Sequence, residues 1–248
     1  MGKSKIIEIC CGSYEDALCA YRGGAKRIEL NSALYLGGLT PSLASLQLTK
    51  KNTDLKVICM VRPRGAGFCY SPDDFQVMKL DEELLLENGA DGIAFGYLNS
   101  DSTINIEQTK TLIELTHKYG KEAVFHRAFD CVKDPFVTAE KLIELGADRI
   151  LTSGQKATAW EGRKVIAQLQ KKYGSKIEIL AGSGINKENA NIIMEETGIF
   201  QVHSSCKEWK KDPTTKGNEV TYEYAPSPHE NDYEAVSEEI VKGLTSKN

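Results

Sequence analysis

Short apolar runs alternate with longer amphipathic stretches along most of the chain. Eight runs have the length and pattern of buried strands: Ile6–Cys11, Arg27–Leu30, Leu55–Val61, Gly92–Phe95, Glu122–His126, Arg149–Thr152, Ile177–Ala181 and Phe200–His203. Eight stretches have helical periodicity: Tyr14–Arg22, Ser42–Lys50, Asp73–Glu87, Ile106–Tyr119, Pro135–Leu145, Ala159–Tyr173, Lys187–Glu195 and Tyr233–Gly243. Strands separated by helices pair in parallel, so the pattern predicts an α/β fold, a (β/α)8 TIM barrel, as a single domain over residues 1–248.

An internal repeat supports this prediction. The segments GAKRIEL (24–30), GADGIAF (89–95) and GADRILT (146–152) are similar, and Gly198 begins a degenerate fourth copy. A glycine before each strand is typical of a left-handed helix C-cap followed by a tight turn. A doubly wound open sheet is the main alternative, but the residues after Ile6–Cys11 do not form a glycine-rich phosphate turn. The irregular segment 204–231 is expected to be the long final βα loop, able to act as a lid.

Composition and charge argue against several classes of protein, including nucleic-acid-binding and membrane proteins. The chain is 41% hydrophobic and 27% charged, as globular proteins are. Its net charge of −4 offers no basic face, so we expect no nucleic-acid partner. No apolar stretch has transmembrane length, and Glu8 interrupts the N-terminal apolar run, so we expect neither a membrane span nor a secretory signal. Seven cysteines without a C-x-x-C pair favour a cytoplasmic location.

Charged side chains gather at the predicted strand ends, where TIM barrels carry their chemistry. Burying them costs several kcal/mol each unless they are paired or solvated, so a polar cavity is expected there. The candidate catalytic residues are Glu8, Glu29, Arg62, His126, Asp130 and His203. The alternative is a buried ion-pair network, for example between Glu29 and Arg62.

Small and hydroxyl-bearing residues follow the last strands, where barrels often hold a phosphate. The candidate anion-binding residues are Ser153, Gly182, Gly184, Ser204 and Ser205. The alternative for the glycines is a tight turn between strand and helix.

Two adjacent cysteines, Cys10 and Cys11, end the first predicted strand. Neighbouring strand residues point to opposite faces, so the two thiols are not expected to chelate one ion. Cys10 shares a face with Glu8, and Glu29 shares a face with Asn31.

Seven strand-end segments resemble the CutC copper-homeostasis protein family: IEIC (7–10), RIELN (27–31), GGLTPS (37–42), VRPRG (61–65), FHRAFD (125–130), LTSG (151–154) and VHSS (202–205). The resemblance runs from about Ile6 to Ser205. It implies a cytoplasmic TIM barrel that binds copper, as Cu(I), with Cys10 as the metal ligand, and it implies homo-oligomers. Many members of the family have a cysteine where this chain has Asn31. Met60, Cys11 and Cys69 are the alternative sulfur donors.

Two main hypotheses follow. The first is a copper-binding protein with Cys10 as ligand. The second is an enzyme for a small anionic or phosphorylated metabolite, with Glu8 or Glu29 as base and His126 as acid or polarising donor. Arg62 and the backbone of residues 182–184 and 204–205 would hold the anion. A divalent metal on Glu8, Glu29 and His126 fits the second hypothesis. A non-catalytic scaffold is a third option, which leaves the converging polar groups unexplained.

Overall fold

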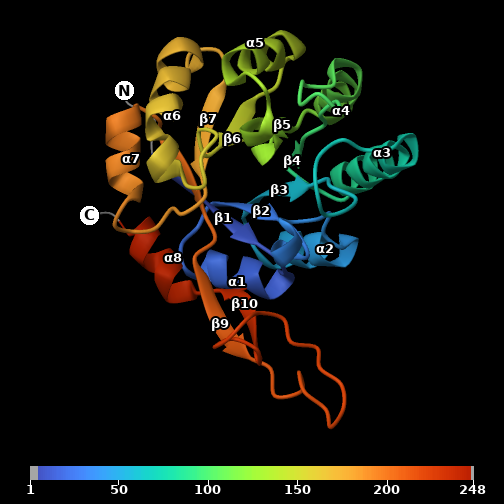
Figure 1. Cartoon of the computed structure of the whole chain (residues 1–248), viewed down its shortest axis with the longest axis vertical. Coiled ribbons are helices and arrows are strands. Elements are labelled where there is room, and N and C mark those ends of the chain that lie inside the picture. The colour runs from blue at the N-terminus through green and yellow to red at the C-terminus, as the bar shows by residue number, and fades with distance from the viewer. Residues whose placement is uncertain (1–4, 247–248) are drawn as a thin grey trace.

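Eight parallel strands close into a barrel in chain order, as the computed structural model of the chain shows for residues 5–246 (Figure 1). The strands are β1 (Ile6–Cys11), β2 (Arg27–Leu30), β3 (Lys56–Met60), β4 (Gly92–Phe95), β5 (Glu122–Phe125), β6 (Arg149–Thr152), β7 (Glu178–Gly182) and β8 (Gln201–Ser204). Because β1 pairs with β8, the sheet has no open edge. The predicted TIM barrel is therefore confirmed, and the open doubly wound sheet is excluded. Residues 1–4, which belong to the segment assessed above for a secretory signal, lie outside the described residues.

Helices surround the barrel in Figure 1. They are α1 (Tyr14–Arg22), α2 (Leu43–Asn52), α3 (Pro72–Glu87), α4 (Ile106–Lys118), α5 (Pro135–Leu145), α6 (Ala159–Tyr173), α7 (Ala190–Thr197) and α8 (Glu238–Thr245), with short 3-10 helices η1 (Leu34–Leu36) and η2 (Arg127–Cys131). In the described part of the chain, no helix is long and apolar enough to cross a lipid bilayer.

The repeated glycines have the predicted backbone conformation. Gly24, Gly89, Gly146 and Gly198 have φ values of +89°, +96°, +88° and +76°. This left-handed region is accessible to glycine at little cost, and it turns the chain sharply from a helix into the next strand.

The main hydrophobic core lies between the strands and the helices. The barrel interior is separate from this core and is only partly apolar. Ile9, Ile28 and Ile93 point outward and are fully buried beneath the helices. A separate small cluster of Ile58, Met60, Ala94 and Val124 is contributed by β3, β4 and β5. Alternation along each strand places this cluster on the face opposite the outer core. One wall of the barrel interior is therefore apolar, whereas β1, β2 and β8 carry acidic and basic groups.

The C-terminal part departs from the prediction. Residues 233–236, expected to begin a helix, belong to β10 (Asp232–Val236), which pairs antiparallel with β9 (Lys207–Lys211). The helical interpretation was wrong there because the strand pairing satisfies these backbone groups, and the helix begins only after Ser237. The predicted irregular segment 204–231 likewise contains β9. The chain between β9 and β10 extends away from the barrel in Figure 1.

Candidate functional site

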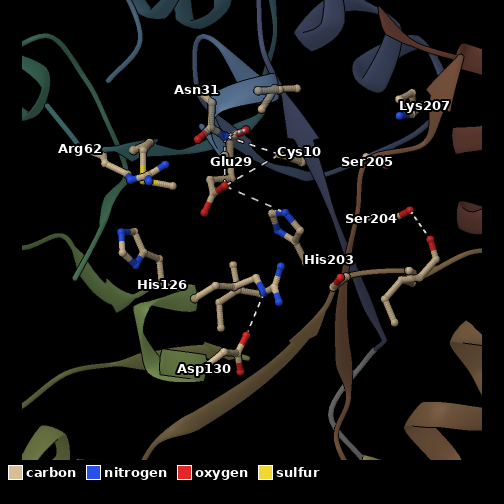
Figure 2. Close-up of a pocket in the computed structure, with 18 of the residues that line it drawn as sticks. Cys10, Glu29, Asn31, Arg62, His126, Asp130, His203, Ser204, Ser205 and Lys207 are labelled. Carbon is tan, nitrogen blue, oxygen red and sulfur yellow. Dashed lines mark hydrogen bonds and ion pairs between the residues drawn. The ribbon is translucent and has the colours of Figure 1, made fainter. Parts of the chain in front are cut away.

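A cavity of about 480 Å³ opens at the carboxyl ends of the strands. Five of the six predicted catalytic residues line it together with Cys10: Glu29, Arg62, His126, Asp130 and His203 (Figure 2). Glu8 lies deeper in the barrel, because it precedes Cys10 by two residues on the same face of β1. The expected polar cavity is therefore present, and its walls come from most of the strands.

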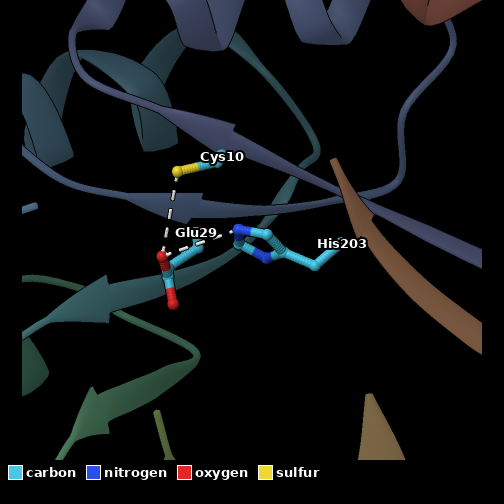
Figure 3. Close-up of side chains that lie close together, drawn as sticks. All are labelled: Cys10, Glu29 and His203. Atoms are coloured by element: carbon cyan, nitrogen blue, oxygen red, sulfur yellow. Dashed lines mark hydrogen bonds and ion pairs between the residues drawn. The ribbon is translucent and has the colours of Figure 1, made fainter. Parts of the chain in front are cut away.

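Three potential metal ligands converge on one side of this cavity. The donor atoms of Cys10, Glu29 and His203 all lie within 4.8 Å of one another (Figure 3). The Cys10 Sγ and the His203 Nε2 are each 4.0 Å from the Glu29 Oε2. We call these residues the Cys10 cluster.

The strand register explains this convergence. Cys10 is the register partner of Glu29 between β1 and β2, and Glu8 is that of His203 between β1 and β8. Register partners point to the same face, so both pairs project into the barrel interior. Cys11 points the other way and is fully buried in the outer core, as predicted.

Glu8 orients the imidazole of His203. The His203 Nδ1 is 2.9 Å from the Glu8 Oε1, and the Glu8 Oε2 is 2.5 Å from the Arg27 Nε. Although burial favours the neutral acid, Arg27 and His203 hold the pKa of Glu8 well below its ordinary value. Burial opposes the charged form of His203 too, but its hydrogen bonds with Cys10 and Glu8 raise the pKa of His203 well above the usual range. With its Nδ1–H donated to Glu8, His203 presents Nε2 to the Cys10 cluster.

Asn31 supports the other two members of the cluster. Its Nδ2 donates to the Glu29 Oε2 at 3.0 Å and to the Cys10 Sγ at 3.6 Å. Burial raises the pKa of Glu29, and the nearby Glu8 carboxylate adds to this shift. Burial also raises the pKa of the Cys10 thiol. Asn31, which stands where many members of the family have a cysteine, therefore donates a hydrogen bond to the Cys10 thiol.

Arg62 follows β3 and lines the cavity on the same side as His126 (Figure 2). Its guanidinium donates hydrogen bonds to the carbonyl oxygens of Leu36, Gly38 and Ala66. No ion pair joins it to Glu29 among the described residues, so the alternative of a Glu29–Arg62 pair is wrong.

His126 lines the same wall of the cavity, and its imidazole is neutral. Its Nδ1 accepts a hydrogen bond from the Ala128 backbone N–H at 3.1 Å, so its proton is on Nε2. The Nε2 is buried and has no hydrogen-bond partner among the described residues. Burial lowers the pKa of His126 to about 3, and the positive charge of Arg62 contributes. His126 therefore acts as a hydrogen-bond donor and not as a cation.

Asp130 lines the cavity, but its carboxylate is largely occupied. It accepts hydrogen bonds from the backbone N–H and hydroxyl of Ser153 and from the Thr152 hydroxyl, and it pairs with Arg127 at 2.8 Å. Ser153 is fully buried and donates to Asp130, so it positions that carboxylate.

The predicted anion-binding segment is only partly in the cavity. Gly184, Ser204 and Ser205 line it. The Ser204 hydroxyl already donates to the Ile185 carbonyl at 2.7 Å. At Gly182 an added Cβ would lie 2.7 Å from the Leu151 side chain, so this glycine serves packing between strands.

Sequence reasoning missed Phe68 and Gly96. The ring of Phe68 lies 5.0 Å from the Arg62 guanidinium and 5.1 Å from the His126 ring. A Cβ at Gly96 would lie 2.5 Å from the His126 Cε1, so the glycine makes room for that ring. A glycine directly after β4 was a usable signal for close approach, whereas nothing in the loop sequence identifies Phe68.

Comparisons with known proteins agree with this architecture. The sequence profile of the CutC family matches residues 5–208. A relative from Treponema denticola named as a CutC family protein is 48% identical over 220 residues, 89% of each chain. The copper homeostasis protein cutC homolog of Mus musculus is 41% identical, covering 83% of this chain and 75% of that protein.

A solved structure named for the copper homeostasis protein CutC of Streptococcus agalactiae has a TM-score of 0.76 and 30% identity, over 81% of this chain and 98% of that one. Phosphoribosylanthranilate isomerase from Pyrococcus furiosus, with a TM-score of 0.55 and 14% identity, shares the fold alone. The profile match and the identities with these relatives show that the chain belongs to the CutC family.

Proposed function

We propose that this chain binds a copper ion at the Cys10 cluster and serves copper homeostasis. One observation carries the proposal: a thiol, an imidazole nitrogen and a carboxylate oxygen lie within 4.8 Å of one another at the mouth of the barrel. The relatives named for copper homeostasis support the choice of metal.

The donor chemistry suits copper. Thiolate ligands favour Cu(I), and imidazole binds copper in either common oxidation state. Cys10 and His203 would be the principal ligands, and Glu29 would supply a third, harder donor. Ligating histidines commonly donate their other ring N–H to a carboxylate, which fixes the tautomer and raises ligand basicity. Glu8 stands in this relation to His203, at 2.9 Å. Binding would displace the proton of the Cys10 thiol and the Nε2 proton of His203, whose pKa is raised by its contacts with Cys10 and Glu8, so affinity rises with pH.

A competition experiment tests the proposal. Purified reduced protein would be titrated against the Cu(I) complex of a chromophoric chelator such as bicinchoninate. We expect uptake of one Cu(I) per chain, and an at least tenfold weaker affinity in Cys10→Ser and in His203→Gln. Cys69→Ser is the matched control: Cys69, one of the alternative sulfur donors considered from the sequence, is an exposed free cysteine in the loop before α3 and does not line the cavity. Uptake that is absent from the wild type, or unchanged in Cys10→Ser, would contradict the proposal.

A second candidate function is an enzyme for a small anionic metabolite. The buried Arg62 and the neutral His126 in the cavity favour it. In this account Glu29, whose pKa is raised by burial, exchanges a proton with the substrate. Glu8 is unsuited to that role because it is ion-paired with Arg27. Incubation with a small-metabolite extract, followed by mass spectrometry, should show a compound consumed by the wild type but not by Glu29→Gln. Identical profiles would contradict this candidate.

A cytoplasmic location is part of the proposal. All seven cysteines are free, which suits a reducing compartment. Fractionation of cells that express the tagged chain measures this directly. Homo-oligomer formation and a lid function for residues 204–231 stay predictions.

A further inference from the structure

The charged groups that line the cavity mostly neutralise one another. Arg127 pairs with Asp130 at 2.8 Å, and Lys207 pairs with Glu234 at 2.7 Å. Arg62 is different: the described residues offer it no carboxylate within ion-pair distance. Among the described residues of the cavity wall, Arg62 is therefore a cation without a counter-charge.

This cation is buried as well as unpaired. Arg62 is 4% exposed, and its hydrogen bonds go to three backbone carbonyls. Carbonyl dipoles orient a guanidinium, but they do not cancel its charge. An uncompensated buried charge is costly, and an anion in the cavity would remove that cost.

A second donor lies on the same wall. His126 is 3% exposed, and its Nε2–H has no partner among the described residues. The Phe68 ring contacts both the Arg62 guanidinium and the His126 ring, at centroid distances of 5.0 and 5.1 Å. Figure 2 shows Arg62 and His126 together on one side of the cavity, with His203 on the other. One small group could therefore be held by both side chains.

We infer that Arg62 and His126 form a binding subsite for the carboxylate of a small organic acid. The single unpaired positive charge matches a monoanionic group better than a phosphate dianion. The cavity of about 480 Å³ also has apolar lining suited to a short carbon skeleton: Leu34, Met60, Phe68, Leu151 and Ile185. The subsite goes beyond copper binding and does not require the metal.

The test uses the full chain, freed of metal with a chelator, and named probes. Monocarboxylates from acetate to hexanoate would be titrated by calorimetry and by NMR of 15N-labelled histidine. The primary amides of the same lengths are uncharged controls, and inorganic phosphate tests the competing anion chemistry. We expect the carboxylates to bind, to shift the His126 Nε2 resonance, and to bind at least tenfold more tightly than the matching amides.

Pairs of variants distinguish the loss of a hydrogen-bond donor from a general effect on folding. His126→Gln can place an amide donor near the original Nε2, whereas His126→Asn keeps an acceptor near Nδ1 for the Ala128 N–H. We expect His126→Asn to weaken carboxylate binding at least fivefold and His126→Gln to retain it within twofold. Arg62→Gln should weaken binding at least tenfold. Arg64→Gln is the matched control, because Arg64 pairs with Asp74 outside the cavity.

Three results would overturn the inference. The first is no carboxylate binding at 10 mM ligand by the folded protein. The second is phosphate binding that exceeds carboxylate binding and is lost in Arg62→Gln and in His126→Asn, since the subsite would then be a phosphate site. The third is carboxylate binding that appears only in copper-loaded protein and is lost in Cys10→Ser, since the anion would then be a metal ligand. Copper uptake by metal-free protein is measured separately, so failure of one proposal is distinguishable from failure of the other.

Discussion

The buried arginines at the two ends of the barrel interior differ in their ion pairing. At the strand starts, Arg27 pairs with Glu8 and donates to Gln201, and Arg149 pairs with carboxylates at the starts of β5 and β7. At the strand ends, Arg62 has only backbone carbonyls, and His126 leaves a ring N–H unpartnered among the described residues.

The two ends of the barrel interior therefore have different roles: the strand starts contribute to stability, and the strand ends form the proposed binding site. Groups that satisfy one another at the strand starts hold neighbouring strands together and leave nothing for a ligand. At the strand ends, Arg62 and the Nε2–H of His126 are held in position without a pairing partner among the described residues, and this is the end at which TIM barrels carry their active sites. Glu8 connects the two ends, because it pairs with Arg27 below and orients His203 above.

The largest effect on the free energy of unfolding is expected from a substitution at the strand starts. Arg27→Met removes the arginine partner of the buried Glu8 carboxylate and leaves His203 as its remaining ion-pair partner among the described residues. We expect a loss of about 3–5 kcal/mol in the free energy of unfolding, measured by urea denaturation. Arg22→Met is the control, because Arg22 forms an exposed pair with Glu238, and it should change stability little. An equally small effect for Arg27→Met would contradict the structural role of this end.

Another buried carboxylate lies outside both ends of the barrel interior. Glu82 on α3 is fully buried, accepts a hydrogen bond from Thr116, and has no arginine partner among the described residues. Burial raises the pKa of Glu82 from 4.5 to about 8. Between these pH values the folded state binds more protons than the unfolded state, so stability falls as pH rises from 4.5 to 8.

Glu82→Gln removes this ionisation and keeps an acceptor for Thr116. We expect the variant to gain about 2–4 kcal/mol over the wild type at pH 8 and much less near pH 4.5, by denaturation at each pH. A gain that does not depend on pH would show that the Glu82 carboxyl does not titrate in this window.

A substitution at Gly96 should have a smaller effect on stability and should disturb the site at the strand ends. In Gly96→Ala the new Cβ would lie 2.5 Å from the His126 Cε1 and 2.6 Å from the Ala128 Cβ. We expect a loss of about 1–3 kcal/mol in stability, from overpacking, and a displaced His126 resonance with weakened carboxylate binding. Gly67→Ala is the matched control, because a Cβ there meets nothing within 4 Å. Unchanged carboxylate binding in Gly96→Ala would argue against His126 as a ligand donor.

The smallest effect concerns the segment between β9 and β10. The Tyr224 ring contacts the ring of Tyr35, in η1, at a centroid distance of 5.2 Å. Tyr224→Ala should cost about 1 kcal/mol locally, seen as faster hydrogen exchange in residues 212–231. Tyr222→Ala is the control, because Tyr222 is 81% exposed. Equal exchange in both variants would show that the Tyr35 contact does not hold the segment.

The sequence predicted the barrel and most of its cavity for clear physical reasons. Period-2 and period-3.6 patterns and the glycine repeats determine the strands, and alternation determines which side chains face inward. The partners of Arg62 were not predictable, because backbone carbonyls of a distant loop leave no sequence pattern. Residues 233–236 were misassigned because β10 forms only through its pairing with β9. The role of Asn31 was missed because its hydrogen bonds to Glu29 and Cys10 depend on side-chain geometry.

Copper K-edge X-ray absorption on Cu(I)-loaded protein tests the copper-binding proposal most directly. We expect one sulfur and one imidazole nitrogen around the copper in the wild type, with the sulfur lost in Cys10→Ser and the imidazole lost in His203→Gln. A copper environment that keeps its sulfur in Cys10→Ser, or that shows no sulfur in the wild type, would contradict binding at the Cys10 cluster.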